Sequence, residues 1–249
     1  MPVLKEKEWI FLNEIIHMIY DTRDLNEMRI NTLELLSILI PNSSASFYLA
    51  NMTNQEDKLF FDPVVLNMAQ SDVTNYLDFG EKLDYTVPIY QNARPIAYKE
   101  TDLFDDSFRE NTEFYNEFLA HGLEFPMALC IANEGVCYGA LSLFRSKRMG
   151  DFSDRDIFIL SQLRRHLVTK IRFECDKKNY YGNRLDEIRA KYFLTTRECE
   201  IINYMLEGLN NEEICQRLFI EEGTVKKHVH NIYSKLNVKN RIQLLKMLI

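Results

Sequence analysis

Cysteine, glycine, proline and tryptophan are all scarce in this sequence of 249 residues. The five cysteines form no C-x-x-C pair, so neither a zinc site nor a disulfide framework is indicated. Eight glycines and six prolines exclude a collagen-like chain,. With 46% hydrophobic and 27% charged residues, the composition is that of a globular protein. We expect reduced thiols, no metal and no cofactor.

Long apolar runs are also missing. No run approaches the ~20 residues that cross a bilayer. Residues 1–8 (MPVLKEKE) lack the charged-then-apolar layout of a signal peptide,. We therefore expect a cytoplasmic protein that has no membrane partner.

Acidic residues are absent from the C-terminal end. All 37 acidic residues precede position 223. The basic residues after it are Lys226, Lys227, Lys235, Lys239, Arg241 and Lys246. The net charge of -7 argues against nonspecific nucleic-acid binding by the whole molecule,. A basic end on an acidic body instead indicates an attached nucleic-acid-binding domain.

The first two thirds of the chain predict an α+β domain. Apolar spacing predicts amphipathic helices at 5–20 and 25–40, a strand at 44–50, and a second strand between 57 and 68 that contains Pro63,. Residues 85–90 fit either a strand or an extended loop. A short helix at 112–121 precedes a hairpin around Gly135 and a long helix opened by Ser153. This order fits one antiparallel sheet with packed helices.

The long helix carries an apolar stripe of Ile157, Leu160, Leu163, Leu167 and Ile171,. Either this stripe or the first two helices is predicted to hold two copies of the chain together. Residues 176–190 are polar and interrupt the stripe. We therefore place a linker there, between a domain at 1–175 and a second domain at 191–249.

The last sixty residues predict a helix-turn-helix. Thr195 with Glu198, and Asn210 with Glu213, have the spacing of capping boxes that begin two short helices,. Gly208 suits the left-handed end of the first. A third helix at 222–236 places Val225, Val229, Ile232 and Leu236 on one face and Lys227, His230 and Ser234 nearly opposite,. One face can pack while the other contacts a major groove.

This segment, LTTRECEIINYMLEGLNNEEICQRLFIEEGTVKKHVHNIYSKLNVKNRIQLL, resembles the C-terminal helix-turn-helix of the LuxR family of bacterial transcription regulators. The resemblance implies an all-α four-helix domain that binds double-stranded DNA as a homodimer through a last helix capped by Asn240. It implies DNA contacts by Thr224, Lys226, Lys227, His230 and Asn231. Further phosphate-contact candidates are Asn211, Lys235 and Arg241. Two residues depart from the family pattern: Glu221 replaces a capping serine, and Cys215 replaces an alanine.

The family resemblance leaves three options for the N-terminal domain. A phosphoacceptor domain begins with a strand, whereas this chain begins with helices. An acyl-homoserine lactone sensor has several tryptophans, whereas Trp9 is the only one here. The passage GVCYGALSLFRSKRMGDFSDRDIFILSQLRRHL is similar to GAF domains. Pocket candidates are Phe47, Tyr85, Tyr90, Cys130 and Tyr138, residues that also suit a core.

The sequence therefore predicts a transcriptional regulator that binds a pseudo-palindromic promoter site as a homodimer. A small-molecule effector in the GAF-like domain is expected to control it, and RNA polymerase is a further candidate partner. The alternatives are an enzyme, or a ligand-free dimerisation module, that carries a regulatory DNA-binding domain. We expect no catalytic residues, because the chain has no nucleophile elbow, glycine-rich phosphate loop or metal set.

Overall fold

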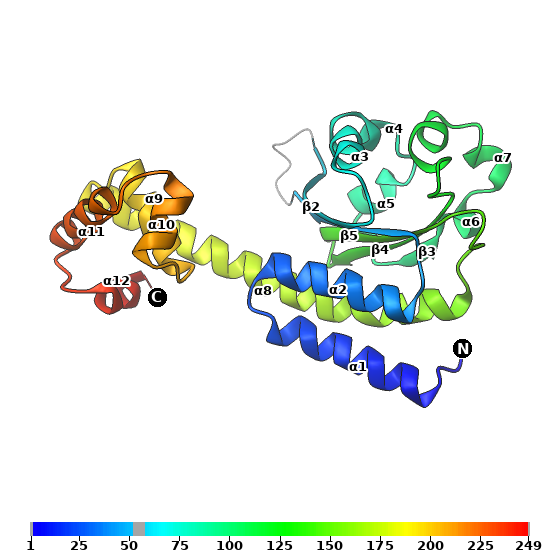
Figure 1. Ribbon diagram of the computed structural model, residues 1–249, viewed down its shortest axis with the longest axis horizontal. Helices are drawn as coiled ribbons and strands as arrows, with labels where there is room; N and C mark the ends of the chain where they lie inside the picture. Colours follow the sequence, from blue (N-terminus) through cyan, green and yellow to red (C-terminus); the bar gives the residue numbers. More distant parts are fainter. Residues whose placement is uncertain (1, 52–57, 249) are drawn as a thin grey trace. The chain divides into compact units, whose positions relative to one another are not determined.

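The computed structural model of this protein describes residues 2–51 and 58–248, with the side chains of 177–183 outside the description. The chain forms two compact units, Met1–Phe173 and Glu174–Ile249 (Figure 1). Among the described residues, no helix is long and apolar enough to cross a membrane.

The N-terminal unit contains one five-stranded sheet and helices on both of its faces. Its strands are β1 (Ser44–Ala50), β2 (Phe60–Leu66), β3 (Ala97–Lys99), β4 (Phe125–Asn133) and β5 (Val136–Arg145). Its helices are α1 (Glu6–Asp21), α2 (Leu25–Leu39), α3 (Gln70–Asn75), η1 (Tyr76–Gly80), α4 (Glu81–Leu83), α5 (Val87–Gln91), α6 (Glu100–Leu103), α7 (Asp106–Arg109), η2 (Tyr115–Leu119) and the first part of α8 (Asp154–Tyr192).

The sheet has the order β2-β1-β5-β4-β3, and every neighbouring pair is antiparallel. This confirms the predicted α+β fold. The predicted hairpin joins β4 to β5, and Glu134 and Gly135 both have positive φ angles, 50° and 79°, as a tight two-residue turn requires. Pro63 is tolerated in β2 because this strand is at the edge of the sheet. Residue 57, where that strand was predicted to begin, lies outside the described residues.

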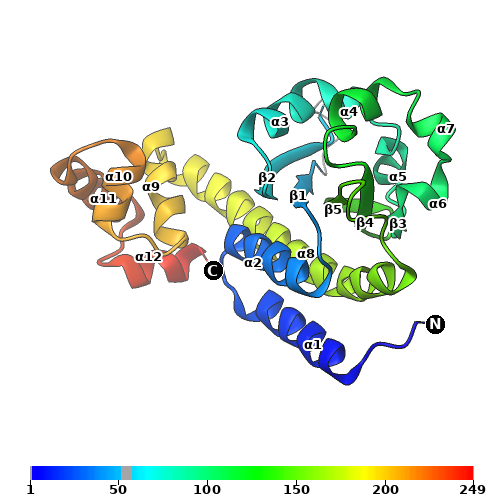
Figure 2. The same ribbon diagram turned by 45° about the vertical axis from the view of Figure 1, so that its right-hand side comes forward.

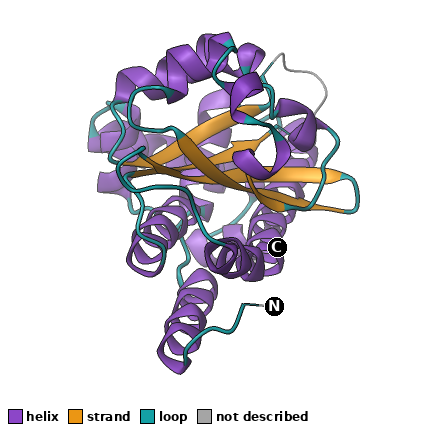
Figure 3. Ribbon diagram, turned by 90° about the vertical axis from the view of Figure 1, so that its right-hand side faces the viewer, coloured by secondary structure: helices purple, strands orange, loops and turns teal. Residues whose placement is uncertain are grey.

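The two faces of the sheet carry side chains of different size. On one face, strand alternation presents large residues such as Phe47, Leu129 and Leu141, all fully buried,. Figure 1 shows α2 and α8 along this face, and α1 lies beyond them (Figure 2). The opposite face presents Ser46, Ala128, Ala140 and Ser142 in the centre of the sheet. Shorter helices cover this second face (Figure 3), and Figure 1 labels α3, α4 and α5 among them.

Two features of this unit differ from the predictions. Residues 87–91 form helix α5, and Pro88 occupies its first turn, where its missing amide costs nothing,. The stripe on α8 cannot hold two copies together, because Leu160, Leu163 and Leu167 are fully buried in the core of their own unit. A residue that already packs in the core has no surface left for a partner. That predicted interface is therefore wrong.

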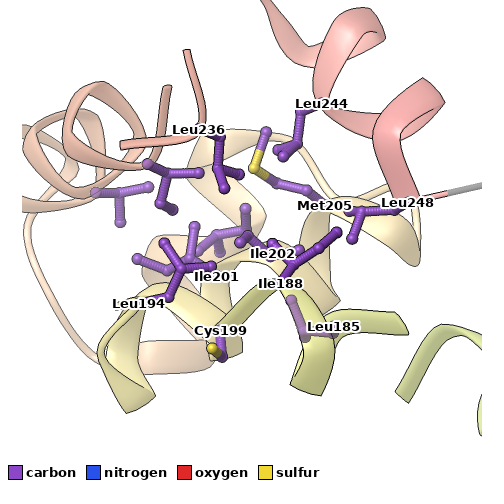
Figure 4. Packing of buried hydrophobic residues seen from close by; sticks show 13 residues of the cluster. Leu185, Ile188, Leu194, Cys199, Ile201, Ile202, Met205, Leu236, Leu244 and Leu248 are labelled. Atoms are coloured by element: carbon purple, nitrogen blue, oxygen red, sulfur yellow. The ribbon is translucent and has the colours of Figure 1, made fainter. Parts of the chain in front are cut away.

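The predicted linker at 176–190 is part of α8, which continues to Tyr192. Its polar composition reflects exposure, since Asp186 and Glu187 face solvent. Leu185 and Ile188 are buried in the core of the C-terminal unit, and Figure 4 shows both among its apolar side chains. These two residues precede position 191, where the sequence placed the start of the second domain.

The C-terminal unit contains the end of α8 and four further helices, α9 (Thr196–Leu206), α10 (Asn211–Leu218), α11 (Glu222–Leu236) and α12 (Arg241–Leu248). Both predicted capping boxes are present. Gly208 has a φ of 96° after α9, and the Asn240 side chain accepts a hydrogen bond from the Gln243 amide at the start of α12. The core of this unit joins Ile201, Ile202, Met205, Leu236, Leu244 and Leu248 (Figure 4).

Candidate functional site

Helix α11 follows α10 through a tight turn. Phe219 ends α10 with a left-handed backbone, φ 51° and ψ 44°, and the Ile220 amide donates back to the Cys215 carbonyl at 3.2 Å. Val225 and Ile232 are fully buried, and Leu236 is 4% exposed. These three residues fix α11 against the core, as its apolar periodicity predicts.

The exposed side of α11 carries polar and basic groups. The structure brings together five of the predicted DNA-contact residues there, all exposed: Thr224, Lys226, Lys227, His230 and Asn231. The Lys226 Nζ lies 2.7 Å from a carboxylate oxygen of Glu222, one turn earlier. No ion-pair partner of Lys227 occurs in the described part of the chain. The helix therefore presents hydrogen-bond donors of the kind that contact phosphates and base edges.

Lys235 and Arg241 are engaged within their own domain. The Lys235 Nζ lies 2.7 Å from Oε2 of Glu198 and donates to the Phe193 carbonyl at 3.0 Å. The Arg241 guanidinium donates to the carbonyl oxygens of Leu209 and Met205, at 2.6 and 2.5 Å. These contacts tie α11 and α12 to the two ends of α9. Both residues thus have a structural role that the sequence did not predict. Asn211, the first residue of α10, is half-buried.

The buried carboxylate of Glu198 makes two charged or capping contacts in this domain. Burial of its carboxyl group acts to raise the pKa, but hydrogen bonds from Lys235 and from the Thr195 amide outweigh burial and hold the pKa below the usual value. The carboxylate is therefore ionised at neutral pH. It closes the α9 capping box and neutralises Lys235 at the same time.

Glu221 occupies the N-cap position of α11, with an extended backbone at φ -71° and ψ 149°. Its side chain accepts no cap hydrogen bond. Glu221 thus stands where the family pattern has its capping serine, but its carboxylate accepts from no backbone amide of the first turn. The exposed carboxylate lies at the start of the helix whose next turns carry Thr224, Lys226 and Lys227.

The N-terminal unit encloses a cavity of about 100 Å³ between the small-residue face of its sheet and the helices that cover it. Aromatic rings form much of its wall, and they come from β1, β2, β3, β5, η1, α5 and the segment around η2. These rings belong to Tyr48, Phe60, Tyr76, Tyr90, Tyr98, Phe114, Phe118 and Phe144. A mostly apolar, partly enclosed cavity with a few polar groups is the usual form of a small-molecule site.

Asp84 is a polar group in this cavity and is only 9% exposed. Its Oδ1 accepts from the Thr86 amide at 2.8 Å and from the Thr86 hydroxyl at 2.7 Å. Its Oδ2 accepts from the Tyr76 hydroxyl at 2.9 Å. Burial raises the pKa of Asp84 above its ordinary value, and the hydrogen bonds from Thr86 and Tyr76 only partly oppose that rise.

Glu100 is the second buried acid of the cavity. Its Oε2 accepts from the Tyr85 hydroxyl at 2.6 Å and lies 3.4 Å from Nε of Arg109. Burial raises its pKa to about 7, although Tyr85 and Arg109 act in the opposite direction. Arg109 is itself buried and also donates to the Glu124 carbonyl at 2.5 Å. The charge of Glu100 thus has a partner within the fold.

Some of the pocket residues predicted from the sequence line the cavity and others do not. Tyr90 lines the cavity, whereas Tyr85, Cys130 and Tyr138 are outside its described lining. The prediction that Phe47 lines the pocket was wrong, because Phe47 lies on the opposite face of the sheet under the guanidinium of Arg29. Strand alternation could have corrected this choice, since Tyr48 is next in the chain and faces the cavity. Nothing in the sequence indicates that Asp84, in a segment left unassigned, is buried.

The C-terminal unit has the fold and the exposed basic helix of a helix-turn-helix DNA-binding domain. Residues 193–248 match the family of bacterial regulatory proteins of the luxR family. The C-terminal domain belongs to this family, as its sequence motifs predict. The family is described as one of bacterial regulatory proteins, which agrees with the predicted regulator.

Two curated relatives show how far the similarity extends. The transcriptional regulatory protein LnrK of Bacillus subtilis is 48% identical over 61 residues, which are 24% of this chain and 28% of that protein. The chain thus spans little more than a quarter of that relative. The monoamine regulon transcriptional regulator of Klebsiella aerogenes is 28% identical over 216 residues, which are 85% of this chain and 86% of that protein.

The N-terminal unit is similar in fold to a GAF domain. The GAF domain of a phosphoenolpyruvate-protein phosphotransferase from Coxiella burnetii superposes with a TM-score of 0.53 at 14% identity. The superposition covers 69% of this chain and 96% of that domain. The expected GAF-like fold is confirmed. The chain therefore consists of a GAF-like domain followed by a LuxR-type helix-turn-helix domain.

Proposed function

We propose that this protein is a transcriptional regulator that binds a pseudo-palindromic DNA site as a homodimer and responds to a small molecule in its GAF-like domain. The observation that carries the proposal is α11, a helix fixed by Val225, Ile232 and Leu236 that exposes basic and amide side chains on its other side. The similarity to a regulator along 85% of this chain supports a regulatory role for both domains together.

The side chains of α11 have complementary chemistry for DNA. Lys227 can donate to guanine O6 and N7, and Asn231 can pair bidentately with adenine. Thr224, Lys226 and His230 flank these two residues and supply donors for phosphates or further bases. Asn211 remains a phosphate-contact candidate at the start of α10. Lys235 and Arg241 already donate hydrogen bonds within their own domain, so they are weaker candidates for phosphate contacts than the sequence suggests.

Binding-site selection with the full chain tests this function. Lys227→Ala is expected to lower DNA affinity by ~1 to 3 kcal/mol and to relax the base preference at one position of each half-site. Lys82→Ala is a matched control, because it removes the same charge from an exposed site of the N-terminal unit outside the helices proposed as interfaces. Enrichment of no common sequence, or equal affinity and preference for wild type and Lys227→Ala, would contradict the proposal.

Exposed apolar side chains in the described part of each unit support the proposed homodimer. Ile242 on α12 is 66% exposed, and Trp9 and Ile10 on α1 are 42% and 55% exposed. Exposed side chains of this size suit contact with a second copy. The last helix and the first helices therefore remain the proposed interfaces. A bacterial DNA target would place the protein in the cytoplasm, where RNA polymerase is the further proposed partner.

The cavity of the GAF-like domain is the proposed effector site. This cavity favours a ligand-binding domain over a ligand-free dimerisation module. A void and buried acids both cost stability, and a module that binds no ligand has no use for either. Ligand binding is tested by calorimetry on the full chain. Cleavage or turnover of bound small molecules would favour the enzyme alternative instead.

A further inference from the structure

Asp84 lacks the basic partner that three other buried acids of this protein have, and Glu124, which is also 9% exposed, accepts from the Lys147 amide instead. Glu100, Asp156 and Glu198 each have a basic side chain within 3.4 Å. In the described part of the chain, no lysine, arginine or histidine forms an ion pair with Asp84. Its three hydrogen bonds come from neutral groups, the Thr86 amide and the hydroxyls of Thr86 and Tyr76. A buried carboxylate without a cation is costly, and Asp84, unlike Glu124, lines the cavity, which indicates a function,.

The cavity as a whole is acidic. Its described lining includes Asp72, Asp84 and Glu100 and contains no lysine, arginine or histidine. Arg109, which pairs with Glu100, is outside that lining. An anionic ligand would meet uncompensated negative charge here. A cationic ligand would supply the missing charge.

The aromatic walls favour a cation for a second, independent reason. The rings of Tyr48, Phe60, Tyr76 and Tyr90 are arranged edge-on or tilted to one another, with centroids 5.1 to 5.8 Å apart. Ring faces attract cations, and the attraction is strongest where water is excluded. The Tyr90 and Tyr98 hydroxyls bond to each other at 3.0 Å. The same rings provide apolar surface for the rest of a ligand.

The volume limits the size of the ligand. A cavity of about 100 Å³ is somewhat smaller than the roughly 150 Å³ engineered cavity that is known to hold one benzene molecule. An aliphatic group less bulky than a benzene ring, such as a small branched chain, is therefore the largest body that fits without movement of the covering helices,.

Building on the proposed effector site, we propose that this cavity binds a small organic amine in its protonated form. The ammonium group would bind the Asp84 carboxylate, and a small aliphatic group would lie among the tyrosine rings. The acidic lining excludes carboxylates and phosphates of the same size.

The test compares matched probes by calorimetry on the full chain. The probes are isobutylamine and 3-methylbutylamine, each with the alcohol and the carboxylate of the same carbon skeleton. The amine is expected to bind about 10-fold to 100-fold more tightly than its alcohol, as a charged hydrogen bond implies. The carboxylates are expected not to bind.

Substitutions in the cavity test whether the amine binds at Asp84. Asp84→Asn is expected to remove the preference for amine over alcohol, whereas the alcohol binds as before. Asp78→Asn is the matched control, because this carboxylate pairs with Lys58 near the surface. Since Asp84→Asn also alters three hydrogen bonds, its unfolding midpoint is measured in parallel. Tyr48→Leu provides a second test, because it removes a ring face but no charge and is expected to weaken the amine more than the alcohol.

Each outcome has a defined meaning. Equal or tighter binding of the alcohols or carboxylates overturns the amine proposal and leaves the effector site in place. Binding of none of the probes overturns the amine proposal as well. Ala140→Leu fills the cavity from β5 and must abolish amine binding, since binding that survives lies elsewhere. DNA binding through α11 is measured separately, so the failure of either proposal is recognised by itself.

Discussion

Glu221 combines two opposing effects at one position. As the N-cap residue of α11, its negative charge favours the positive end of the helix. The same charge would repel a phosphate chain that passes the start of this helix. Because the side chain makes no cap hydrogen bond, the carboxylate contributes to the helix only through its charge.

A serine at this position separates the two effects. Glu221→Ser is expected to add the missing cap bond, which stabilises the domain by about 0.5 to 1 kcal/mol. It is also expected to tighten DNA binding, chiefly at low ionic strength, because salt screens repulsion between exposed charges. The measurement is affinity for one operator at several salt concentrations. Equal affinity throughout, or weaker binding by the serine variant at low salt, would show that Glu221 does not face the phosphates.

Glu100 makes the stability of the N-terminal unit depend on pH. Burial raises its pKa in the folded protein to about 7 from an ordinary value of 4.5, so the folded state holds this proton more tightly than the unfolded state. Stability is therefore lost as pH rises from about 4.5 to 7, by up to about 3 kcal/mol. Glu100→Gln is expected to lose less stability than wild type between pH 5 and pH 8.

Denaturant unfolding of both proteins at the two pH values measures this difference. Other groups titrate equally in both, so the comparison isolates Glu100. The exposed Glu113 offers a control, since Glu113→Gln is expected to behave like wild type. Parallel loss of stability in Glu100→Gln and wild type would contradict the assignment.

At the scale of elements, the last turns of α8 form part of the DNA-binding domain. Leu185 and Ile188 are 4% and 3% exposed and pack with the core residues of α9, α11 and α12. A fragment that begins at residue 190, the end of the predicted linker, leaves their positions empty. Truncation of one buried leucine or isoleucine alone usually costs 2 to 5 kcal/mol, an order-of-magnitude guide here.

We therefore expect fragment 184–249 to be more stable than fragment 190–249 by at least about 3 kcal/mol. Denaturant unfolding of the two fragments checks this. The free energy of unfolding of Leu185→Ala in the longer fragment should lie between those of the two fragments. Asp186→Ala, at an exposed neighbouring residue, should be as stable as the unsubstituted longer fragment. Equal stability of the two fragments would mean that these helical turns contribute no packing energy.

The elements that the sequence predicts correctly are those with local signals. Thr195 with Glu198, and Asn210 with Glu213, begin their helices where the capping boxes place them, and Gly135 turns the hairpin. Elements that depend on tertiary contacts are harder to predict. Residues 87–91 have β-branched and aromatic side chains but form a helix, because Pro88 favours a first helical turn and Tyr90 packs into the core.

The candidate sites follow the same rule. The exposed face of α11 follows from helical periodicity and needs no other part of the chain. The engagement of Lys235 and Arg241 depends on where the ends of α9 lie, which periodicity does not show. The cavity draws its lining from eight or more separated segments. No local pattern in the sequence identifies Asp84 among the many acidic residues.

For the whole molecule, the proposed homodimer gives tight DNA binding from two modest contacts. Once one recognition helix is bound, the second half-site is reached at a high effective concentration. Since the α8 stripe is buried, Ile242 is the best exposed apolar candidate on the last helix.

Ile242→Glu is therefore expected to weaken DNA binding by the full chain at least ~10-fold by loss of paired binding. Gln243→Glu, a neighbouring exposed residue with the same change of charge, serves as control. Sedimentation with and without operator DNA reports the state of association. Wild type that remains monomeric in both conditions would contradict the homodimer.

The difference in side-chain size between the two faces of the sheet has an evolutionary consequence. Ser46, Ala128, Ala140 and Ser142 bound the cavity from the central strands, whereas the helix-packed core lies on the reverse side of the same strands. A single substitution at one of these four positions resizes the chamber but leaves that core intact. If the proposed effector binds there, duplicated copies of such a gene can diverge toward larger or smaller inducers by one-step changes, while each copy keeps its helix-turn-helix domain.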